Sequence, residues 1–296
     1  MTDEIDISEM SAEELAVKVG DIDDFRLTHP ILRDRVEEIT QENLVWRQAF
    51  RDYDATGINS NTVQFPVPDD EIGNPDVVAE GAEFPREQET YSKESLTFSK
   101  YGFEIALTHE ATEDAMIDVV RDQVDRQARQ MSEEMNRQAF QVIANNNRGT
   151  IEGDSDGVFT YDDVLSGRRP LMQDNFDPDL LIADLDAAHD LLQDGNFLEA
   201  TEEQSDMRRA GQIGEIAGFD VIQADDDFDI TGTAGGNSDN PGAVMVDTDF
   251  YGYEGEREPI TSEEYREDRT QTDVYRVYTR MGWLAIDPKA CAVIEG

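Results

Sequence analysis

An acidic loop over residues 152–163 has the spacing of a calcium-binding loop. Its acids occupy positions one, three, five and twelve, and a glycine occupies position six, as calcium coordination requires. These residues are Glu152, Asp154, Asp156, Asp163 and Gly157. Position one is ordinarily Asp and position twelve a bidentate Glu, so the shorter Asp163 would weaken a site. Because such spacing arises easily by chance in an acidic chain, a solvated loop is the favoured interpretation. Bound calcium or another cation stays the alternative, and we expect no other cofactor.

Other motifs of catalysis are missing from the sequence. The three histidines are far apart, and His109-Glu110 lacks the second histidine of a zinc-protease helix. The chain has no GxxxxGK[ST] phosphate loop, no GxSxG elbow and no cysteine cluster. The densest basic spots are Arg168-Arg169 and Arg208-Arg209, fewer cations than a DNA-neutralising surface usually needs. We expect these arginines to meet carboxylates within or between subunits, and we expect no enzymatic activity.

The charge of the chain is extreme. Its 68 Asp plus Glu face 24 Lys plus Arg in 296 residues, a formal net charge of -44. The basic residues are mostly arginine, whose planar guanidinium pairs carboxylates bidentately. Such charges repel at ordinary ionic strength, whereas at molar salt the Debye length falls to roughly 3 Å. The charge is spread along the chain and 38% of residues are apolar, which argues against disorder and nucleic-acid mimicry. The composition therefore predicts a folded protein adapted to very high salt.

Cysteine usage and hydropathy exclude other classes. Cys291 is the single cysteine, so no intrachain disulfide can form, and its apolar neighbours predict a buried thiol. The first twenty residues are acidic without an apolar signal core, and no apolar run nears the about 18 residues of a membrane span. We expect neither a signal peptide nor a membrane association.

The first hundred residues predict a helical arm and then an extended excursion. Ser11 and Glu14 have the spacing of a capping box that opens a short helix, and Pro30 opens a second helix ending near Phe50. Alternation over 63–67 predicts a strand. Residues 66–94 are rich in Pro, Gly and acids, with little apolar content for a core of their own.

A long helix is the clearest expected element. Before it, apolar residues alternate on even positions at 96–98 and on odd positions at 101–107, which predicts a bend near Lys100–Gly102. Residues 109–145 then carry an apolar stripe stepping by three or four residues. The stripe comprises Met116, Val120, Val124, Ala128, Met131, Met135, Ala139 and Val142. Three acid–arginine pairs four apart are expected on the other face, namely Asp122–Arg126, Asp125–Arg129 and Glu133–Arg137.

The remaining chain predicts a compact α/β module and a closing antiparallel sheet. A polar loop covers 146–163, and a helix is expected after the first of three short buried strands. These strands are 180–183, 218–223 and 243–246, and the helix is 186–193. The closing strands are 274–281, 283–286 and 290–294.

Taken in order, these elements resemble the Hong Kong 97 type of tailed-virus major capsid protein. The resemblance covers about residues 60–294 and also rests on four local segments: VAEGAEFP from Val78, IALTHEATED from Ile105, IGEIAGFDV from Ile213 and RMGWLAIDPKACAVI from Arg280. It implies an α+β fold with an N-terminal arm (1–58), an E-loop β-hairpin with flanking strands (59–100), a peripheral domain with a spine helix (101–158), an α/β axial domain (159–257) and closing strands of the peripheral domain (258–296).

The resemblance implies a subunit that assembles as hexamers and pentamers into an icosahedral shell around double-stranded DNA, without sequence-specific binding. The E-loop of one subunit would lie over its neighbour, and its expected contact residues are Val78, Phe84, Arg86, Lys93 and Phe98. Lys93 is the only lysine of the excursion, but no signature marks an asparagine partner for a crosslink. A portal, a scaffold or protease, and decorating proteins are the further expected partners.

The salt adaptation places such a virus in a haloarchaeal host, with assembly in the host cytoplasm and the protein in the virion capsid. Two alternatives stay open at this point. An encapsulin-like compartment shell of a halophilic cell would share the fold and package cargo enzymes. A salt-adapted metal-dependent hydrolase would need only the abundant carboxylates.

Overall fold

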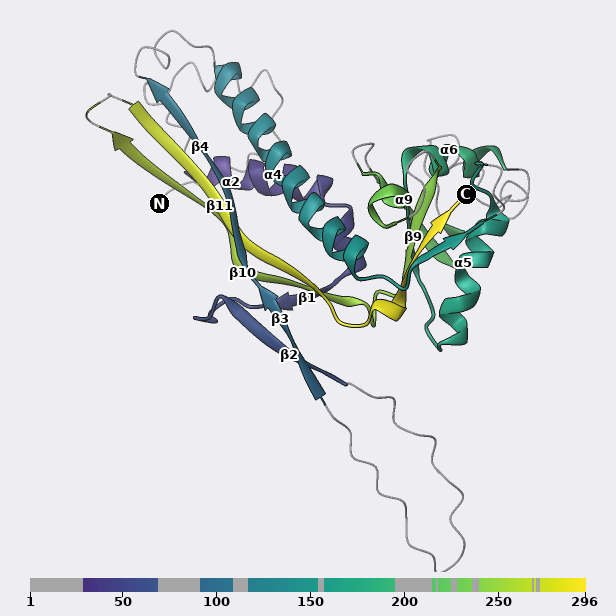
Figure 1. Ribbon diagram of the computed structural model, residues 1–296. Helices are drawn as coiled ribbons and strands as arrows, with labels where there is room; N and C mark the ends of the chain where they lie inside the picture. Colours follow the sequence, from purple (N-terminus) through teal and green to yellow (C-terminus); the bar gives the residue numbers. More distant parts are fainter. Residues whose placement is uncertain are drawn as a thin grey trace, which may run out of the picture.

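The computed structural model describes residues 29–68, 91–108, 117–153, 157–194, 215–216, 218–224, 228–235, 240–267, 269 and 272–296. The described chain has two main parts, an elongated sheet that carries helices on one face and a compact lobe built on a second sheet (Figure 1). A two-stranded hairpin projects from the elongated part. No helix in these ranges is long and apolar enough to cross a membrane.

The elongated sheet has the strand order β1-β10-β11-β4. Its long central pair is antiparallel, from Gly252 opposite Ala285 to Glu267 opposite Thr272, with register shifts on either side of Glu258. β4 adds antiparallel to β11, and β1 adds parallel to β10. The strands are Arg51–Asp54 (β1), Ser99–Thr108 (β4), Gly252–Glu267 (β10) and Thr272–Ala285 (β11).

Two helices and a short 3-10 turn cover one face of this sheet (Figure 1). α4 (Ile117–Asn145) confirms the expected spine helix within the described residues. The second helix is present as α2 (His29–Asn43), but it ends at Asn43 rather than near Phe50, and the separate 3-10 turn η2 (Trp46–Ala49) follows it. The expected helix at 11–20 lies outside those residues. Five residues of the predicted stripe are buried, because they pack on the sheet and on α2: Val124, Ala128, Met131, Met135 and Ala139. Val142 is half-buried, and Phe140 and Ile143 are buried although the predicted stripe did not include them. The side chains of Met116 and Val120 lie outside the described part.

The lobe is built on a six-stranded sheet of order β5-β12-β9-β6-β8-β7. Alternate residues of its central strands face two different cores: Ile182 and Val244 face the core shared with the long helix, whereas Leu181 and Met245 face the core under α5 and α6. Both faces are therefore buried, which explains the continuous apolar runs. The strands are Thr150–Glu152 (β5), Leu180–Ala183 (β6), Glu215–Ile216 (β7), Phe219–Gln223 (β8), Gly242–Val246 (β9) and Cys291–Glu295 (β12).

Short helices complete the lobe. α6 confirms the helix expected after the strand at 180–183, and the Asp184 side chain caps it by accepting a 2.7 Å hydrogen bond from the Ala187 amide. The same carboxylate accepts a 2.7 Å bond from Gly242 N, so it also ties the helix to β9. The helices are Tyr161–Gln173 (α5), Leu185–Gln193 (α6), Ile230–Thr233 (α9) and the 3-10 turn Pro288–Ala290 (η4).

The projecting hairpin pairs β2 (Thr62–Pro68) with β3 (Tyr91–Thr97), and residues 69–90 between them lie outside the described chain. The bend expected after β3 is present. The strand is interrupted at Phe98, where the amide bonds Asn61 O, and the buried positions change from even, at Leu96, to odd, at Ile105. The interruption comes two residues earlier than the sequence predicted, because Ser99 and Lys100 already belong to β4.

The described topology differs from the sequence prediction in several elements, among them the unpredicted short elements β1, β5 and α9. The last strand, β12, was expected to close the peripheral sheet within 258–296; instead it pairs with β9 and β5 in the lobe. β10 was missed as a strand, and it begins at Gly252 inside the expected axial segment. α5 was also missed, because Gly167 and Pro170 lie inside it and both are unfavourable in a helix interior. The other domain boundaries stay a prediction.

Candidate assembly surfaces

The hairpin carries the two described members of the expected neighbour-contact set. Lys93 is exposed on β3, opposite Pro66 of β2. Phe98 is 3% exposed and already buried within its own chain. Val78, Phe84 and Arg86 lie outside the described residues. The structure therefore places Lys93 where a neighbour could reach it, and the contacts themselves stay a prediction.

Two glycines allow the root of the hairpin to pack closely on the elongated sheet. A Cβ at Gly255 of β10 would lie 2.5 Å from Leu96 Cδ2 and 2.7 Å from Phe98 Cε1. A Cβ at Gly282 of β11 would collide with the carbonyl oxygen of Thr97. Real Cβ atoms do not approach other atoms this closely, so larger residues would displace the hairpin. The direction in which the hairpin projects therefore depends on glycine at positions 255 and 282, where a larger side chain would not fit.

An aromatic cluster holds the other strand of the hairpin. The Phe65 ring stacks on the Tyr253 ring with centroids 4.8 Å apart and planes 15° apart. Tyr53 meets Phe65 edge-on at 5.1 Å, and the Arg51 guanidinium lies 4.7 Å from the Tyr253 ring centre. Such pairs add about 0.5–1.5 kcal/mol each beyond the area they bury. Both strands of the stem are thus fixed to β1 and β10.

A buried carboxylate joins the N-terminal segment to the same sheet. The Glu254 side chain is 1% exposed and accepts a 3.0 Å hydrogen bond from Trp283 Nε1. Arg47 Nε lies 3.0 Å from Glu254 Oε1, although its N–H does not point at that oxygen. Burial raises the pKa of Glu254 to about 7, against the lowering effect of Arg47 and the indole. This contact links η2, β10 and β11 and depends on pH.

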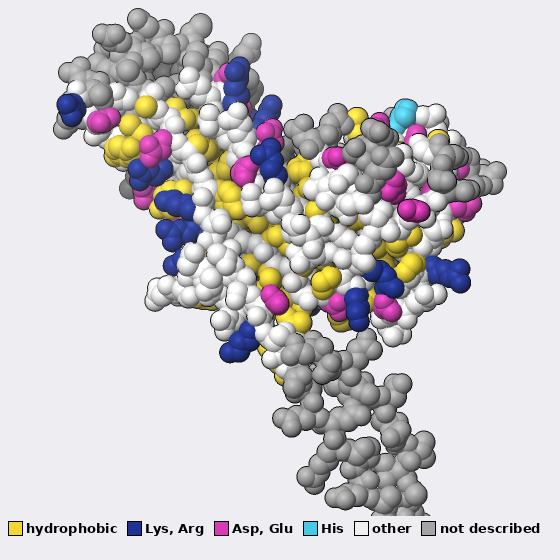
Figure 2. All heavy atoms as spheres, viewed as in Figure 1, with side chains coloured by type: hydrophobic (Ala, Val, Ile, Leu, Met, Phe, Trp, Pro, Cys, Tyr) yellow, Lys and Arg dark blue, Asp and Glu magenta, His cyan; other side chains and the backbone are white. Residues whose placement is uncertain are grey.

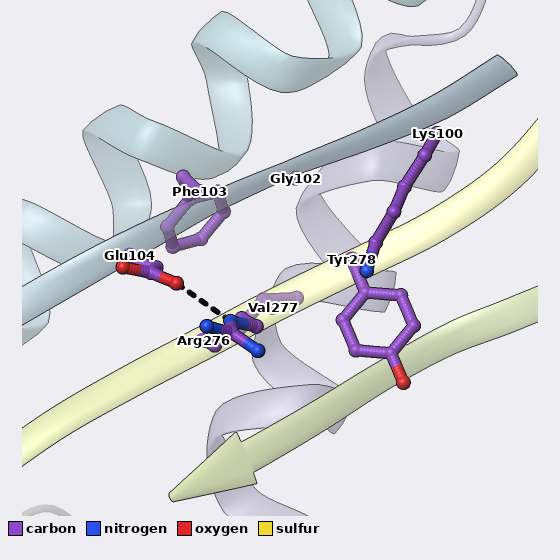
Figure 3. A pocket seen from close by; sticks show the side chains of 7 residues that line it. All are labelled: Lys100, Gly102, Phe103, Glu104, Arg276, Val277 and Tyr278. Atoms are coloured by element: carbon purple, nitrogen blue, oxygen red, sulfur yellow. Dashed lines mark hydrogen bonds and ion pairs between the residues drawn. The ribbon is translucent and has the colours of Figure 1, made fainter. Parts of the chain in front are cut away.

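The face of the elongated sheet opposite the helices forms a shallow hollow of about 700 Å³ (Figure 3). Arg276 Nε donates a 2.6 Å hydrogen bond to Glu104 Oε1, and Lys100 Nζ lies 3.7 Å from the Tyr278 ring centre. Gly102 lies opposite Tyr278 and makes room for the tyrosine side chain, because a Cβ on residue 102 would lie 2.7 Å from Tyr278 Cβ. The lining residues are Lys100, Gly102, Phe103, Glu104, Arg276, Val277 and Tyr278.

The charges of this face pair across three strands. Tyr278 OH donates a 3.0 Å hydrogen bond to Glu263 Oε1, and Arg276 Nη1 lies 3.5 Å from Glu263 Oε2. Further along, Arg280 Nε lies 3.2 Å from Glu258 Oε2. We call these residues the cross-strand ladder: Lys100, Glu104, Glu258, Glu263, Arg276, Tyr278 and Arg280. Its cations and carboxylates balance, in contrast to the strongly acidic chain as a whole.

Sequence reasoning missed this ladder because it missed β10. The segment has too few apolar residues for an alternating pattern. The charges carried a usable signal. Arg276 and Arg280, two residues on either side of Tyr278, face the carboxylates Glu263 and Glu258 of the preceding segment. Opposite charges across an antiparallel pair stabilise it, so charge alternation could have identified the strand.

The expected calcium loop is only partly described. Glu152 is exposed at the end of β5, whereas Asp154 and Asp156 lie outside the described residues. Asp163 is 2% exposed, and its Oδ2 accepts a 2.8 Å hydrogen bond from Thr160 N and a 2.7 Å bond from Thr160 Oγ1. This carboxylate therefore caps the start of α5. Among the described residues, no group of three or more metal-ligating side chains could hold an ion.

Cys291 and His189 are residue types that could act as a nucleophile or a base, and the structure describes the surroundings of both. Cys291 is fully buried, as expected, and burial raises the pKa of its thiol well above the usual range. His189 is exposed on α6, with Nε2 2.6 Å from Gln193 Nε2. His109 lies outside the described residues. The geometry thus offers packed surfaces for association, in the described part of the chain, rather than a reaction centre.

Comparisons with solved structures identify the fold. A subunit from the asymmetric unit of the bacteriophage PhiM1 mature capsid matches with a TM-score of 0.63 and 10% identity, over 86% of this chain and 87% of that one. Mycobacterium phage Adephagia matches with a TM-score of 0.61 and 13% identity, over 97% and 98%. A virus-like particle from Pyrococcus furiosus matches with a TM-score of 0.58 and 10% identity, over 90% and 99%.

A comparison with curated proteins gives no match. The model of a protein family described as "phage capsid protein" matches residues 92–294. This span holds the long helix, the lobe and the closing strands, and it supports a structural role rather than the expected alternative of a hydrolase. Because the match covers more than half of the chain, and the fold is the mixed α+β fold of Hong Kong 97-type capsid structures, this protein belongs to the phage capsid protein family.

Proposed function

We propose that this chain is the major capsid protein of a tailed double-stranded DNA virus. It assembles as hexamers and pentamers into an icosahedral shell that encloses the genome without sequence-specific contacts. The observation that carries this proposal is the family match over residues 92–294, on a fold that covers 87% of a chain from the bacteriophage PhiM1 mature capsid. Its location is the virion capsid, after assembly in the host cytoplasm.

Contacts between neighbours follow from the projecting hairpin in this proposal. The root of the stem packs closely on the elongated sheet at Gly255 and Gly282, and the hairpin of β2 and β3 projects from there, where it could meet another subunit. Residues 59–100 would form the E-loop over the neighbour, with Lys93 on the stem among its contact residues. Residues 1–58 would form the arm, α4, β4, β10 and β11 the peripheral domain, and β5 to β9 with α5, α6 and β12 the axial domain.

The finer proposal is that the shell works in molar salt and that the host is a haloarchaeon. It is supported by the net charge of -44, because subunits this acidic repel one another unless salt screens them. Arginine supplies the cation of ion pairs at α2, α4 and the cross-strand ladder, as expected where carboxylates are abundant.

Electron microscopy of the protein purified in molar salt tests the function. We expect closed icosahedral shells of uniform size, and virions should contain nuclease-protected double-stranded DNA. Particles filled with a cargo enzyme instead of a genome would favour the encapsulin-like compartment. A protein that stays monomeric at every concentration and salt would contradict both.

Dilution from molar salt tests the salt adaptation separately. Shells should loosen or dissociate when the salt falls well below molar, because the Debye length grows from roughly 3 Å at 1 M to about 10 Å at 0.1 M. Light scattering and microscopy at a series of sodium chloride concentrations would measure this. Shells that stay intact in dilute buffer would show that arginine pairing outweighs repulsion.

A portal, a scaffold or maturation protease and decorating proteins are the partners we propose beyond the chain itself. Genes for a portal, a terminase and a protease beside this gene would support them. A neighbouring cargo enzyme with a targeting tail would contradict them.

Calcium bound at Glu152, Asp154, Asp156 and Asp163 is the alternative to a solvated loop. Because Asp163 already caps α5, a bound cation would have to share this carboxylate with the helix. Calcium titration of particle stability, with Asp156→Ala beside the natural protein, decides the point. An identical response of the two proteins would remove the site.

A further inference from the structure

The outward face of α5 carries apolar side chains that a single subunit leaves exposed. Leu165 is 39% and Met172 51% exposed, and they stand seven residues apart on one face of the helix. The opposite face, with Val164, Gly167 and Leu171, is buried against the lobe. Large apolar side chains grouped on one exposed helical face mark an interaction surface.

Two arginines flank these apolar side chains. The Arg168 guanidinium lies 5.0 Å from the centre of the Phe219 ring and 3.6 Å from Asp177, which holds it beside the helix. Arg169 forms no ion pair within the described part of the chain. With Gln173, these side chains border a hollow of about 320 Å³. In Figure 2, basic and hydrophobic side chains lie at the lower edge of the lobe with acidic ones between them, in the region that α5 reaches in Figure 1.

The charge of the chain indicates what covers this face. Every copy carries 68 carboxylates against 24 basic residues, so a second copy presents carboxylates to a guanidinium at almost any orientation. Double-stranded DNA fits less well, because phosphate binding needs several cations and gains nothing from Leu165 and Met172.

We infer that the outward face of α5 is a contact between copies of this chain. Leu165 and Met172 are covered by the neighbouring copy, while Arg168 and Arg169 pair with its carboxylates. The inference rests on the proposed function and specifies one of its contacts. A symmetric contact of α5 with α5 would bring the arginines of both copies together, so a contact with a carboxylate-bearing surface of the neighbour is heterologous, and repetition of it closes a ring when the rotation allows.

Self-association of the full chain in molar salt tests this contact. Arg169→Glu and, separately, Met172→Ser should each raise the subunit concentration needed for association about tenfold, as loss of a central interface side chain does. Arg126→Glu on α4 is the matched control, since this side chain is 73% exposed and the change in charge is the same. Sedimentation measures association, microscopy measures shell closure, and thermal unfolding of the separated subunits checks the fold.

The outcomes separate this inference from the proposed function. Unchanged association of both α5 variants in a protein that forms shells would overturn the inference alone. An equal loss in Arg126→Glu would attribute the effect to net charge and also overturn it. Association that depends on α5 but never closes into shells would sink the proposed function and keep the contact. If Arg169→Glu loses only its binding to a short DNA duplex, the face is a DNA contact and the inference is wrong.

Discussion

The lobe sheet and the elongated sheet are stabilised in different ways. Central strands of the lobe are buried on both faces, so each of their side chains contributes to one core or the other. In the described part of the chain, helices pack on one face of the elongated sheet, and the other face carries the cross-strand ladder. The lobe is thus stabilised by apolar burial on both faces of its sheet. The elongated part is stabilised by apolar burial on one face of its sheet, together with ion pairs and close packing at glycines. This difference predicts how each region responds to substitution, salt and pH.

The largest expected effect is in the lobe. Leu181→Ala removes a fully buried side chain from β6 and leaves a cavity, which should lower the free energy of unfolding by about 2–5 kcal/mol. Leu165→Ala, at an exposed position of α5, is the control and should change it by about 0.5 kcal/mol or less. Denaturant unfolding of unassembled subunits in molar salt measures both. Equal effects would show that the lobe core is not closely packed.

Glu254 should give the elongated part a pH dependence. Burial raises its pKa in the folded state from 4.5 to about 7, so the folded state holds the proton more tightly than the unfolded state does. Stability from this group is therefore fully present below pH 4.5 and is lost as the pH rises to about 7. Glu254→Gln keeps an acceptor for the Trp283 indole and removes this loss, at most about 3 kcal/mol.

Unfolding free energies measured from pH 4 to 8 at constant salt check this sign. The difference between Glu254→Gln and the natural protein should favour the variant increasingly as the pH rises. At the acid end, where Glu254 is protonated, the two proteins should differ least. A constant difference across the range would show that Arg47 keeps this carboxylate charged throughout.

The root of the hairpin comes next in size. Gly282→Ala places a Cβ against the Thr97 carbonyl and should lower the free energy of unfolding by about 1–3 kcal/mol. Because the stem must shift, shell assembly should fall further than this loss of stability explains. Glu264→Ala, at an exposed position of β10, is the control for strand substitution. Assembly of Gly282→Ala at the natural level would show that the direction of the hairpin is adjustable.

The smallest effect is expected in the cross-strand ladder. Arg276→Met removes the cation between Glu104 and Glu263 and should lower the free energy of unfolding only slightly, and less as salt rises, because solvent screens this exposed guanidinium. Exchanging the charges, Arg276→Glu with Glu104→Arg, should recover part of this loss. A loss above the Leu181→Ala effect would reverse the comparison between the two regions.

Elements with an internal signal could be predicted from the sequence. The stripe of α4 and the buried runs of β6 and β9 predicted those elements because their periodicity reflects which faces are buried. The ion pairs of α4 were predicted less well. Asp122 and Arg126 do pair, but Asp125 bonds Arg35 of α2, and Arg137 bonds Glu134. Asp125 pairs with Arg35 of the neighbouring helix α2 rather than with the predicted Arg129 of its own helix.

The sequence by itself determined the charge, the long helix, the order of the main elements and the resemblance to capsid subunits. These follow from composition and local periodicity, which a chain carries without reference to its partners. Tertiary structure decided that β12 joins the lobe, that β10 pairs with β1 and β11, and that Glu254 is buried. It also decided the assembly surfaces described above, because the hairpin root, the ladder and the exposed face of α5 depend on which distant segments come together.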